Sequence, residues 1–293
     1  MSTTKPVWFV TAASSGFGRE ISLEALRRGH TVVATARTPD RIQDLVDAGA
    51  HALAFDVTSP IQKIESTARQ VFEKHGRVDY LVNAAGFIIE GALEETTPEE
   101  VYDCFNTNVF GMMNTIQAFL PHIRSQAIGP RGIRATVVTF GSLGSWEGGA
   151  SYSTYAMTKV CASSLAESLR EELTPFKIRC TAIEPGYFRT GFLNPGRKVT
   201  AKARIDAYED INTPSGQARK GLDATDGNQL GDVKKGCKII VDVLTETGVG
   251  ANKELPVRIV LGSDCEQTIR NKCTSTIKLL DEWKGVAQSS DHS

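Results

Sequence analysis

A tyrosine and a lysine stand four residues apart in one polar, alanine-rich stretch of the chain. Tyr155 and Lys159 lie within residues 151–170, which read SYSTYAMTKVCASSLAESLR. On a helix this spacing places both side chains on one face, one turn apart. An ammonium group held there favours the phenolate form and lowers the pKa of the tyrosine from about 10. Such a tyrosine can exchange a proton with a substrate oxygen near neutral pH. The alternative is an exposed helix that happens to carry both residues.

Apolar runs and amphipathic segments alternate from the N-terminus to about residue 190, which predicts strands joined by helices. A parallel sheet covered by helices on both faces follows, and right-handed crossovers make it a doubly wound α/β fold. With one further strand near the C-terminus we expect seven strands in a single domain spanning 1–293. The expected strands are 7–11, 31–36, 51–55, 80–82, 135–140, 178–183 and 257–261.

Three features qualify this regular pattern. Residues 59–62 (SPIQ) and 97–100 (TPEE) each resemble a capping box with proline at the first helical position. Residues 194–232 lose periodicity and are rich in Gly, Pro, Asp, Thr and Lys. We expect a mobile excursion with one short helix there, acting as a lid over the substrate. The final helix is expected at 265–284, followed by a frayed polar tail from 287 onward.

Composition argues against several classes of function. The net charge of −1 gives no general basic surface for nucleic acid. No window approaches the roughly 18 apolar residues of a membrane span, and the first residues have no stretch suited to a secretion signal. Six scattered cysteines without a Cys-x-x-Cys pair indicate reduced thiols and a cytoplasmic location. The five histidines have no metal-ligand spacing, so no metal site is expected.

The turn after the first expected strand has the composition of a phosphate-binding loop. Residues 11–18 read TAASSGFG, and their small side chains allow a phosphate to approach the backbone. The following helix would present its free N–H groups and positive dipole end to that anion. Ser14 and Ser15 could add hydroxyl donors. The alternative is a tight strand–helix turn without a ligand.

The end of the second strand indicates which dinucleotide would bind. A carboxylate there would hold the ribose 2′-hydroxyl of NAD, but the chain has Arg37, and no acid until Asp40. A guanidinium fork suits a 2′-phosphate, so the sequence predicts NADP(H), unless Arg37 is only a surface arginine. Asp56, after the third strand, could accept a hydrogen bond from the adenine amino group or could merely cap the next helix.

Together these segments resemble the classical short-chain dehydrogenase/reductase family, strongly over residues 7–190 and loosely over the last 60 or so. In order along the chain, the family's motifs T-G-x-x-x-G-x-G, N-N-A-G, N-x-x-G, a strand-end serine, Y-x-x-x-K and P-G-x-x-x-T are matched by 11–18, 83–86, 108–111, Ser142, 155–159 and 185–190. Two of these matches are imperfect, since Ala12 replaces the first glycine and Ala84 the second asparagine.

The resemblance implies a Rossmann-like fold and a role for each matched residue. Tyr155 would be the general acid or base, and Lys159 would hold the nicotinamide ribose and lower the pKa of Tyr155. Ser142 would hydrogen-bond the substrate oxygen, and Asn108 would anchor a water that links Lys159 to solvent. Alternatively, Ser142 is a turn serine and Asn108 only satisfies backbone groups. The cofactor would contact Thr11, Ser14, Ser15, Gly16, Phe17, Gly18, Arg37, Asp56, Val57, Asn83, Ala84, Gly86, Tyr155, Lys159, Phe188 and Thr190.

Aromatic residues near the expected strand ends suggest the substrate. Phe87, Trp146, Tyr187 and Phe192 would line a fairly apolar pocket, unless they only pack beneath the lid. The sequence thus predicts an NADP(H)-dependent oxidoreductase that interconverts a carbonyl and an alcohol on a small, mostly apolar substrate. The resemblance also implies a homodimer or homotetramer that pairs helices 98–126 and 152–173. Two alternatives are a non-catalytic dinucleotide-sensing module and the same fold used for cyclisation or elimination.

Overall fold

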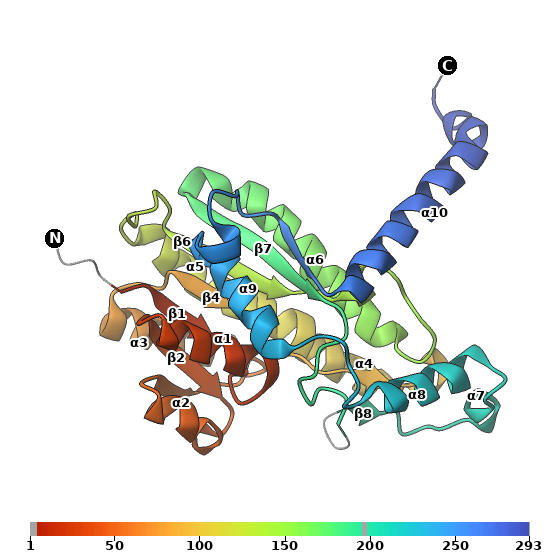
Figure 1. Cartoon of the computed structure of the whole chain (residues 1–293), viewed down its shortest axis with the longest axis horizontal. Helices are drawn as coiled ribbons and strands as arrows, with labels where there is room; N and C mark the ends of the chain where they lie inside the picture. Colours follow the sequence, from red (N-terminus) through yellow and green to blue (C-terminus); the bar gives the residue numbers. More distant parts are fainter. Residues whose placement is uncertain (1–4, 195–197, 293) are drawn as a thin grey trace.

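A parallel sheet with helices on both faces forms the centre of the protein (Figure 1). The computed structural model describes residues 5–194 and 198–292. Within these residues the main sheet has seven strands in the order β3-β2-β1-β4-β6-β7-β9, and every neighbouring pair is parallel. The strands are β1 (Val7–Val10), β2 (Thr31–Ala36), β3 (His51–Ala54), β4 (Tyr80–Val82), β6 (Ala135–Phe140), β7 (Ile178–Pro185) and β9 (Arg258–Leu261). The predicted doubly wound fold is confirmed.

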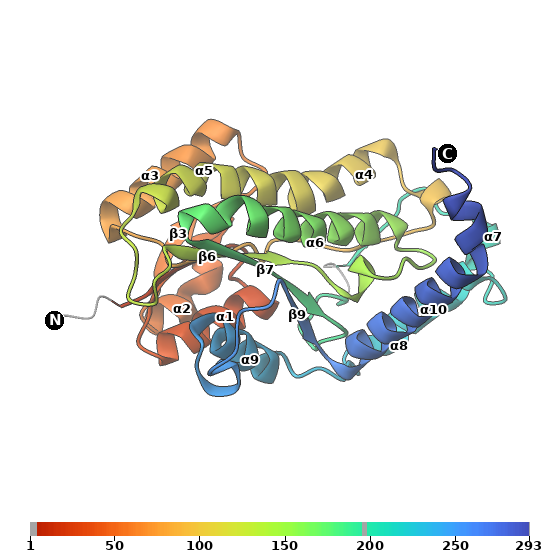
Figure 2. The ribbon, with the colours of Figure 1, turned by 90° about the horizontal axis from the view of Figure 1, so that it is seen from above.

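Two hydrophobic clusters, one on each face, hold the helices to the sheet. Figure 2 shows α1, α2 and α9 below the sheet and α3, α5 and α6 above it. Strands β1 and β6 are buried along their whole length, as expected when both faces of a parallel sheet are covered. The helices are α1 (Gly16–Arg27), α2 (Gln43–Asp47), α3 (Ile61–His75), α4 (Pro98–Phe105), α5 (Gly111–Ser125), α6 (Ser153–Leu173), α7 (Asp206–Glu209), α8 (Pro214–Thr225), α9 (Val233–Thr245) and α10 (Ser263–Gln288).

The two expected capping boxes have different outcomes. Thr97 caps α4, since its hydroxyl accepts from Glu100 N (3.2 Å) and Glu100 Oε2 accepts from Thr97 N (3.0 Å). The box at Ser59 does not form, because Pro60 is extended (φ −50°, ψ 143°) and itself occupies the N-cap of α3. The predicted single helix over 98–126 is also divided, since residues 106–110 form a π-helical turn between α4 and α5.

The excursion after β7 has more structure than the sequence suggested. Beyond residues 195–197, which lie outside the described residues, it contains β8 (Val199–Thr200), α7 and α8. Strand β8 pairs in parallel with β5 (Ile89–Glu90), which follows β4. The expectation of one short helix was therefore wrong.

Buried carboxylates fasten the excursion to the segment after β4. Glu90 and Glu95 are 3% and 0% exposed, and Arg219 of α8 forms an ion pair with each of them. Lys198 also pairs with Glu90, and Glu95 Oε1 accepts from Ile205 N (3.0 Å). These contacts connect residues more than a hundred positions apart, so local sequence patterns give no sign of them.

Helix α10 is longer than predicted and includes the start of the tail expected to fray. It runs away from the sheet, and among its described residues only Cys265 is buried (Figures 1 and 2). Four cysteines are buried and all six are free thiols, as expected. Among the described residues, no helix has the length and apolarity needed to cross a membrane.

We predict that Arg219→Met lowers the free energy of local unfolding of the excursion by about 3–5 kcal/mol, because two buried carboxylates then lack the Arg219 cation. Limited proteolysis should then cut within 198–225 much faster than in the wild type. Arg204→Met is the matched control: Arg204 also pairs with Glu90 but is 34% exposed, so its loss should matter by less than about 1 kcal/mol. Equal proteolysis rates in the two variants would contradict this account of the docking.

Candidate active site

The tyrosine–lysine pair lies on α6, which follows the loop at the carboxyl end of β6. Lys159 Nζ lies 5.4 Å from the centre of the Tyr155 ring and donates to the carbonyl of Phe140, the last residue of β6, at 2.9 Å. The lysine side chain is buried, and among the described residues it belongs to no ion pair. The two side chains therefore share a helix face, as their spacing predicted.

Burial dominates the electrostatics of this pair. Burial raises the pKa of Tyr155, and a hydrogen bond with Ser142 acts in the opposite direction. Burial also lowers the pKa of Lys159 from 10.5 to about 8, against a smaller opposing effect of Cys104. In the protein alone the pKa of Tyr155 is thus raised rather than lowered, and a lowering by Lys159 stays a prediction. The tyrosine is held in its protonated form.

Ser142 begins the short turn after β6. Its Oγ accepts from Gly144 N (3.2 Å), and its own N donates to Ser145 Oγ (3.1 Å). This turn is a 3-10 helix over Leu143–Ser145 with Ser142 at its N-cap. The Ser142 hydroxyl also lies near that of Tyr155, close enough to oppose the rise of the Tyr155 pKa, so the structure brings Ser142, Tyr155 and Lys159 together.

Asn108 lies in the π-helical turn and is 3% exposed. Its Oδ1 accepts from Phe87 N (3.0 Å), while Nδ2 donates to Phe87 O (2.9 Å) and to Thr158 Oγ1 (3.0 Å). The side chain therefore joins the loop after β4 to α6, which agrees with the alternative that it satisfies backbone groups. Gly86 lies beside it, since a Cβ there would be 3.2 Å from Asn108 Oδ1 and 3.6 Å from Lys159 Nζ. The water-anchoring role stays a prediction.

The turn after β1 keeps the shape that a glycine-rich motif requires. A Cβ on Gly18 would lie 2.7 Å from the carbonyl oxygen of Ala12 and 2.9 Å from that of Thr11, so only glycine fits. Gly16 and Ala12 both have positive φ, 56° and 51°. Ala12 thus adopts the left-handed conformation that costs an L-residue roughly 1–2 kcal/mol and that glycine adopts freely. The substitution strains this turn without changing its course.

The start of α1 offers groups that a dinucleotide phosphate could use. Ser15 is the N-cap of α1, but its side chain caps no backbone N–H, and Ser14 precedes it. The first turn of α1 contains no acidic residue. Helix N-termini with free N–H groups favour anions, so this turn fits a phosphate.

Two predicted cofactor residues close to this turn are buried. The hydroxyl of Thr11 accepts from Ala85 N (3.1 Å), so it fastens the loop after β4 to the end of β1. Asn83 Nδ2 donates to Val138 O (3.1 Å), but its buried Oδ1 has no partner among the described residues. Buried polar atoms are rarely left unpaired, so this acceptor is consistent with a ligand in the adjacent crevice. Ala84 packs at the edge of the core nearby.

The remaining cofactor candidates lie after β2 and β3. Arg37 is exposed, and no ion pair or hydrogen bond holds its guanidinium within the described part of the chain. Asp56 Oδ1 accepts from the backbone N and the hydroxyl of Thr58 (2.9 and 2.7 Å), an arrangement closer to a cap than to an open adenine site. Val57 is buried and faces Gly111, where a Cβ would approach it within 2.8 Å.

The segment after β7 approaches the turn after β1. The ring of Phe188 lies 5.3 Å from that of Phe17, between their centres, and its backbone pairs with Gly231. A Cβ on Gly16 would lie 3.4 Å from Thr190 Cβ. The predicted nicotinamide and phosphate regions are therefore contiguous.

The predicted substrate-facing residues separate into two groups. Tyr187 and Phe192 pack with Tyr155 in a small apolar cluster. Phe87 and Trp146 do not belong to it, because Phe87 is held through its backbone by Asn108 and the indole of Trp146 donates to Glu184 Oε2 at 2.8 Å. The other members of this apolar cluster are Ile88, Tyr152, Leu193 and Leu222. Of these four, sequence reasoning proposed only Ile88, next to Phe87, as substrate-facing.

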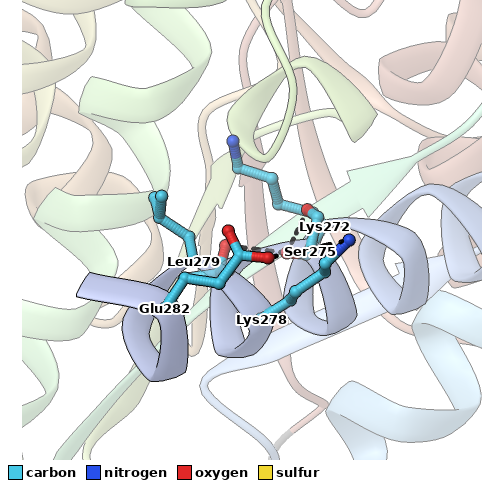
Figure 3. A pocket seen from close by; sticks show the side chains of 6 residues that line it. Lys272, Ser275, Lys278, Leu279 and Glu282 are labelled. Carbon is cyan, nitrogen blue, oxygen red and sulfur yellow. Dashed lines mark hydrogen bonds and ion pairs between the residues drawn. The ribbon is translucent and has the colours of Figure 1, made fainter. Parts of the chain in front are cut away.

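Two surface hollows have no member of this cluster in their lining. One of about 360 Å³ runs along exposed α10 and is lined by Lys272, Ser275, Thr276, Lys278, Leu279 and Glu282 (Figure 3). The other, of about 490 Å³, is lined by Ala92, Leu93, Glu94, Gly149, Ala150, Ser151, Ser153, Tyr208 and Ser215. Neither contains a predicted catalytic residue. Within the described residues no group of three or more His, Cys, Asp or Glu could hold a metal ion.

Comparison with known proteins agrees with this geometry. A family model described as short chain dehydrogenase matches residues 6–200. A 3-ketodihydrosphingosine reductase from Bacteroides thetaiotaomicron is 35% identical over 69% of this chain and 71% of its own length. The crystal structure of a short-chain dehydrogenase from Streptomyces avermitilis superposes with a TM-score of 0.86 at 35% identity, covering 99% of this chain and 100% of that one. A short-chain dehydrogenase/reductase from Burkholderia phymatum, solved in complex with NAD, shares the fold at a TM-score of 0.73 and 20% identity, covering 98% of this chain and 96% of that one.

The chain belongs to the short-chain dehydrogenase family. It is therefore an oxidoreductase of this family.

We predict that Lys159→Met stabilises the protein at pH 7 by about 1–3 kcal/mol, because it removes a buried, unpaired cation. The native pKa of about 8 lies below the unfolded value of 10.5, so the unfolded chain binds more protons between these two pH values. The charged lysine lowers the free energy of unfolding by its full amount below pH 8, and this destabilisation disappears as the pH rises towards 10.5.

Urea unfolding of both proteins at pH 7 and pH 10 measures this difference. The advantage of the methionine variant should shrink at pH 10. A variant less stable than the wild type at both pH values would contradict the assignment of Lys159 as a buried cation.

Proposed function

We propose that this protein is an NADP(H)-dependent oxidoreductase that interconverts a carbonyl and an alcohol on a small, mostly apolar substrate. The observation that supports this most directly is the convergence of Ser142, Tyr155 and Lys159 beside the carboxyl end of β6. In doubly wound sheets, ligands bind at that edge.

The three side chains suit the reduction of a carbonyl. The bound nicotinamide would supply a hydride to the carbonyl carbon. Tyr155, which burial keeps protonated, would give its proton to the oxygen, and Ser142 would donate a hydrogen bond to the same oxygen. Lys159 carries its charge below about pH 8 and would stabilise the tyrosinate that remains.

The cofactor would lie along the carboxyl ends of β1, β4 and β7. Gly16, Gly18 and the start of α1 would hold the pyrophosphate, and Thr190 with the backbone of Phe188 would hold the carboxamide. Arg37 would bind a 2′-phosphate, because its guanidinium is exposed and no carboxylate precedes Asp40 after β2.

The apolar surroundings of Tyr155 favour a lipophilic substrate. Ile88, Leu193, Leu222 and the ring of Phe192, whose centre lies 5.9 Å from that of Tyr155, offer carbon surface rather than charge. A relative named as a reductase of 3-ketodihydrosphingosine is consistent with a ketone on an apolar chain.

Two further proposals concern assembly and location. Exposed apolar side chains on α4 to α6, namely Tyr102, Phe110, Met157 and Val160, are suited to pairing these helices in a homodimer or homotetramer. The six free thiols are consistent with the reducing conditions of the cytoplasm.

We predict that Tyr155→Phe lowers kcat for NADPH-dependent ketone reduction by at least about 100-fold, because the proton donor is lost. The dissociation constant of NADPH, measured by fluorescence, should change little. Tyr102→Phe alters an exposed tyrosine and should retain full activity. Turnover by Tyr155→Phe at the wild-type rate would refute the proposed mechanism.

We predict that Arg37→Asp weakens NADPH binding by about 10–100-fold and improves NADH relative to it, because a carboxylate repels the 2′-phosphate and accepts from a ribose hydroxyl. Titration of each cofactor into both proteins measures the preference. Arg41→Asp makes the same charge change four residues further on and should have a much smaller effect. A wild-type protein that prefers NADH would overturn the assignment of Arg37.

A further inference from the structure

Glu184 is a fully buried carboxylate near the end of β7 that has no part in the mechanism above. Three donors from separate segments converge on it. Ser163 Oγ donates to its Oε1 (2.6 Å), Trp146 Nε1 donates to its Oε2 (2.8 Å), and Arg258 of β9 forms an ion pair with it. Two of the three donors belong to the segments that carry Ser142 and Lys159.

The contacts continue from Glu184 to the catalytic groups. Ser163 lies one turn after Lys159 on α6, and its Oγ is 2.9 Å from Ser145 Oγ. Ser145 Oγ accepts from Ser142 N (3.1 Å) and donates to Lys159 O (2.8 Å). Trp146, which binds Glu184 directly, ends the same turn. Glu184 thus holds the Ser142 turn at two places and α6 at one.

The side chains of this network pack closely around Gly141, the residue that precedes Ser142. A Cβ on Gly141 would lie 2.4 Å from Ser163 Oγ, 2.8 Å from Ser145 Oγ and 3.1 Å from Glu184 Cγ. The hydroxyls and the carboxylate are therefore packed against the residue that precedes Ser142. A shift of any of them moves the backbone of Ser142.

We propose that Glu184 is a positioning residue that sets the distance between the Ser142 hydroxyl and the Tyr155–Lys159 face of α6. The proposal rests on the proposed function, because it concerns the geometry of that site. A reaction slows on the order of 100-fold when its reacting groups are misplaced by about 1 Å. A residue that fixes the position of Ser142 should therefore act on kcat. Glu184 does not touch the turn after β1, which would hold the pyrophosphate, so its loss should act on kcat much more than on cofactor affinity.

Glu184→Gln keeps the volume of the side chain but removes its charge and one acceptor. The matched control is Asp242→Asn, which disturbs another buried carboxylate, 4% exposed and paired with Arg28 at 2.6 Å between α9 and α1. Trp146→Phe is the second variant, because it removes only one donor and leaves the Arg258 pair in place. For each protein we would measure the urea midpoint, the NADPH dissociation constant, and kcat and KM for an apolar ketone.

Glu184→Gln should lower kcat by about 10–100-fold with an NADPH dissociation constant within about twofold of the wild type, and Trp146→Phe should lower kcat by a smaller factor. Asp242→Asn should lose comparable stability but retain kcat. If Glu184→Gln retains kcat, or if kcat falls with stability equally in Asp242→Asn, the inference is wrong while the proposed function stands.

Crystal structures of Glu184→Gln and Asp242→Asn test the positioning itself without any turnover. Ser142 Oγ should move away from the Tyr155 hydroxyl in the first variant and stay in place in the second. A Ser142 that keeps its place in Glu184→Gln would overturn the inference.

Discussion

The site depends on a buried ammonium group, that of Lys159, which forms no ion pair with a carboxylate among the described residues. Lys159 is enclosed between β6 and α6, and its Nζ is held by one backbone carbonyl, that of Phe140. An unpaired charge in such a place opposes folding, so we propose that its position reflects a role beside Tyr155 rather than a contribution to stability. The tyrosine in turn stays protonated because the same burial raises its pKa. In the proposed mechanism this tyrosine is the proton donor, and the neighbouring cation would stabilise its conjugate base.

The rest of the fold brings other groups to that pair and keeps them in register. Ser142 lies just after the carboxyl end of β6, and Asn108 of the π-helical turn binds the backbone of Phe87. The segment after β7 packs against the turn after β1. Glu184 connects two of these parts to each other. The docked excursion adds Leu222 to the apolar cluster, and buried ion pairs fasten it to the segment after β4. The proposed catalytic residues and the apolar residues that enclose them thus come from separate segments, which meet at one edge of the sheet.

Local patterns in the sequence predicted the seven strands of the parallel sheet and many of the residues near its carboxyl edge, because period, capping residues and turn composition act over a few residues. They failed where partners are distant along the chain. The docking of 198–225 depends on Glu90 and Glu95, and the orientation of Trp146 depends on Glu184. The pKa of Tyr155 was expected to fall because the neighbouring charge was visible in the sequence, whereas burial was not. The capping box at Ser59 failed for a local reason, since Pro60 occupies the cap.

The most direct test follows the hydrogen atom that the account assigns to the cofactor. NADPH carrying deuterium at both hydrogen positions of nicotinamide C4 is oxidised in the presence of an apolar ketone, and the alcohol is analysed by mass spectrometry. The account predicts one deuterium on the carbinol carbon for each NADPH consumed. A product that contains no deuterium, with the label still on the cofactor, would contradict it and would favour a sensor, a cyclase or an eliminating enzyme.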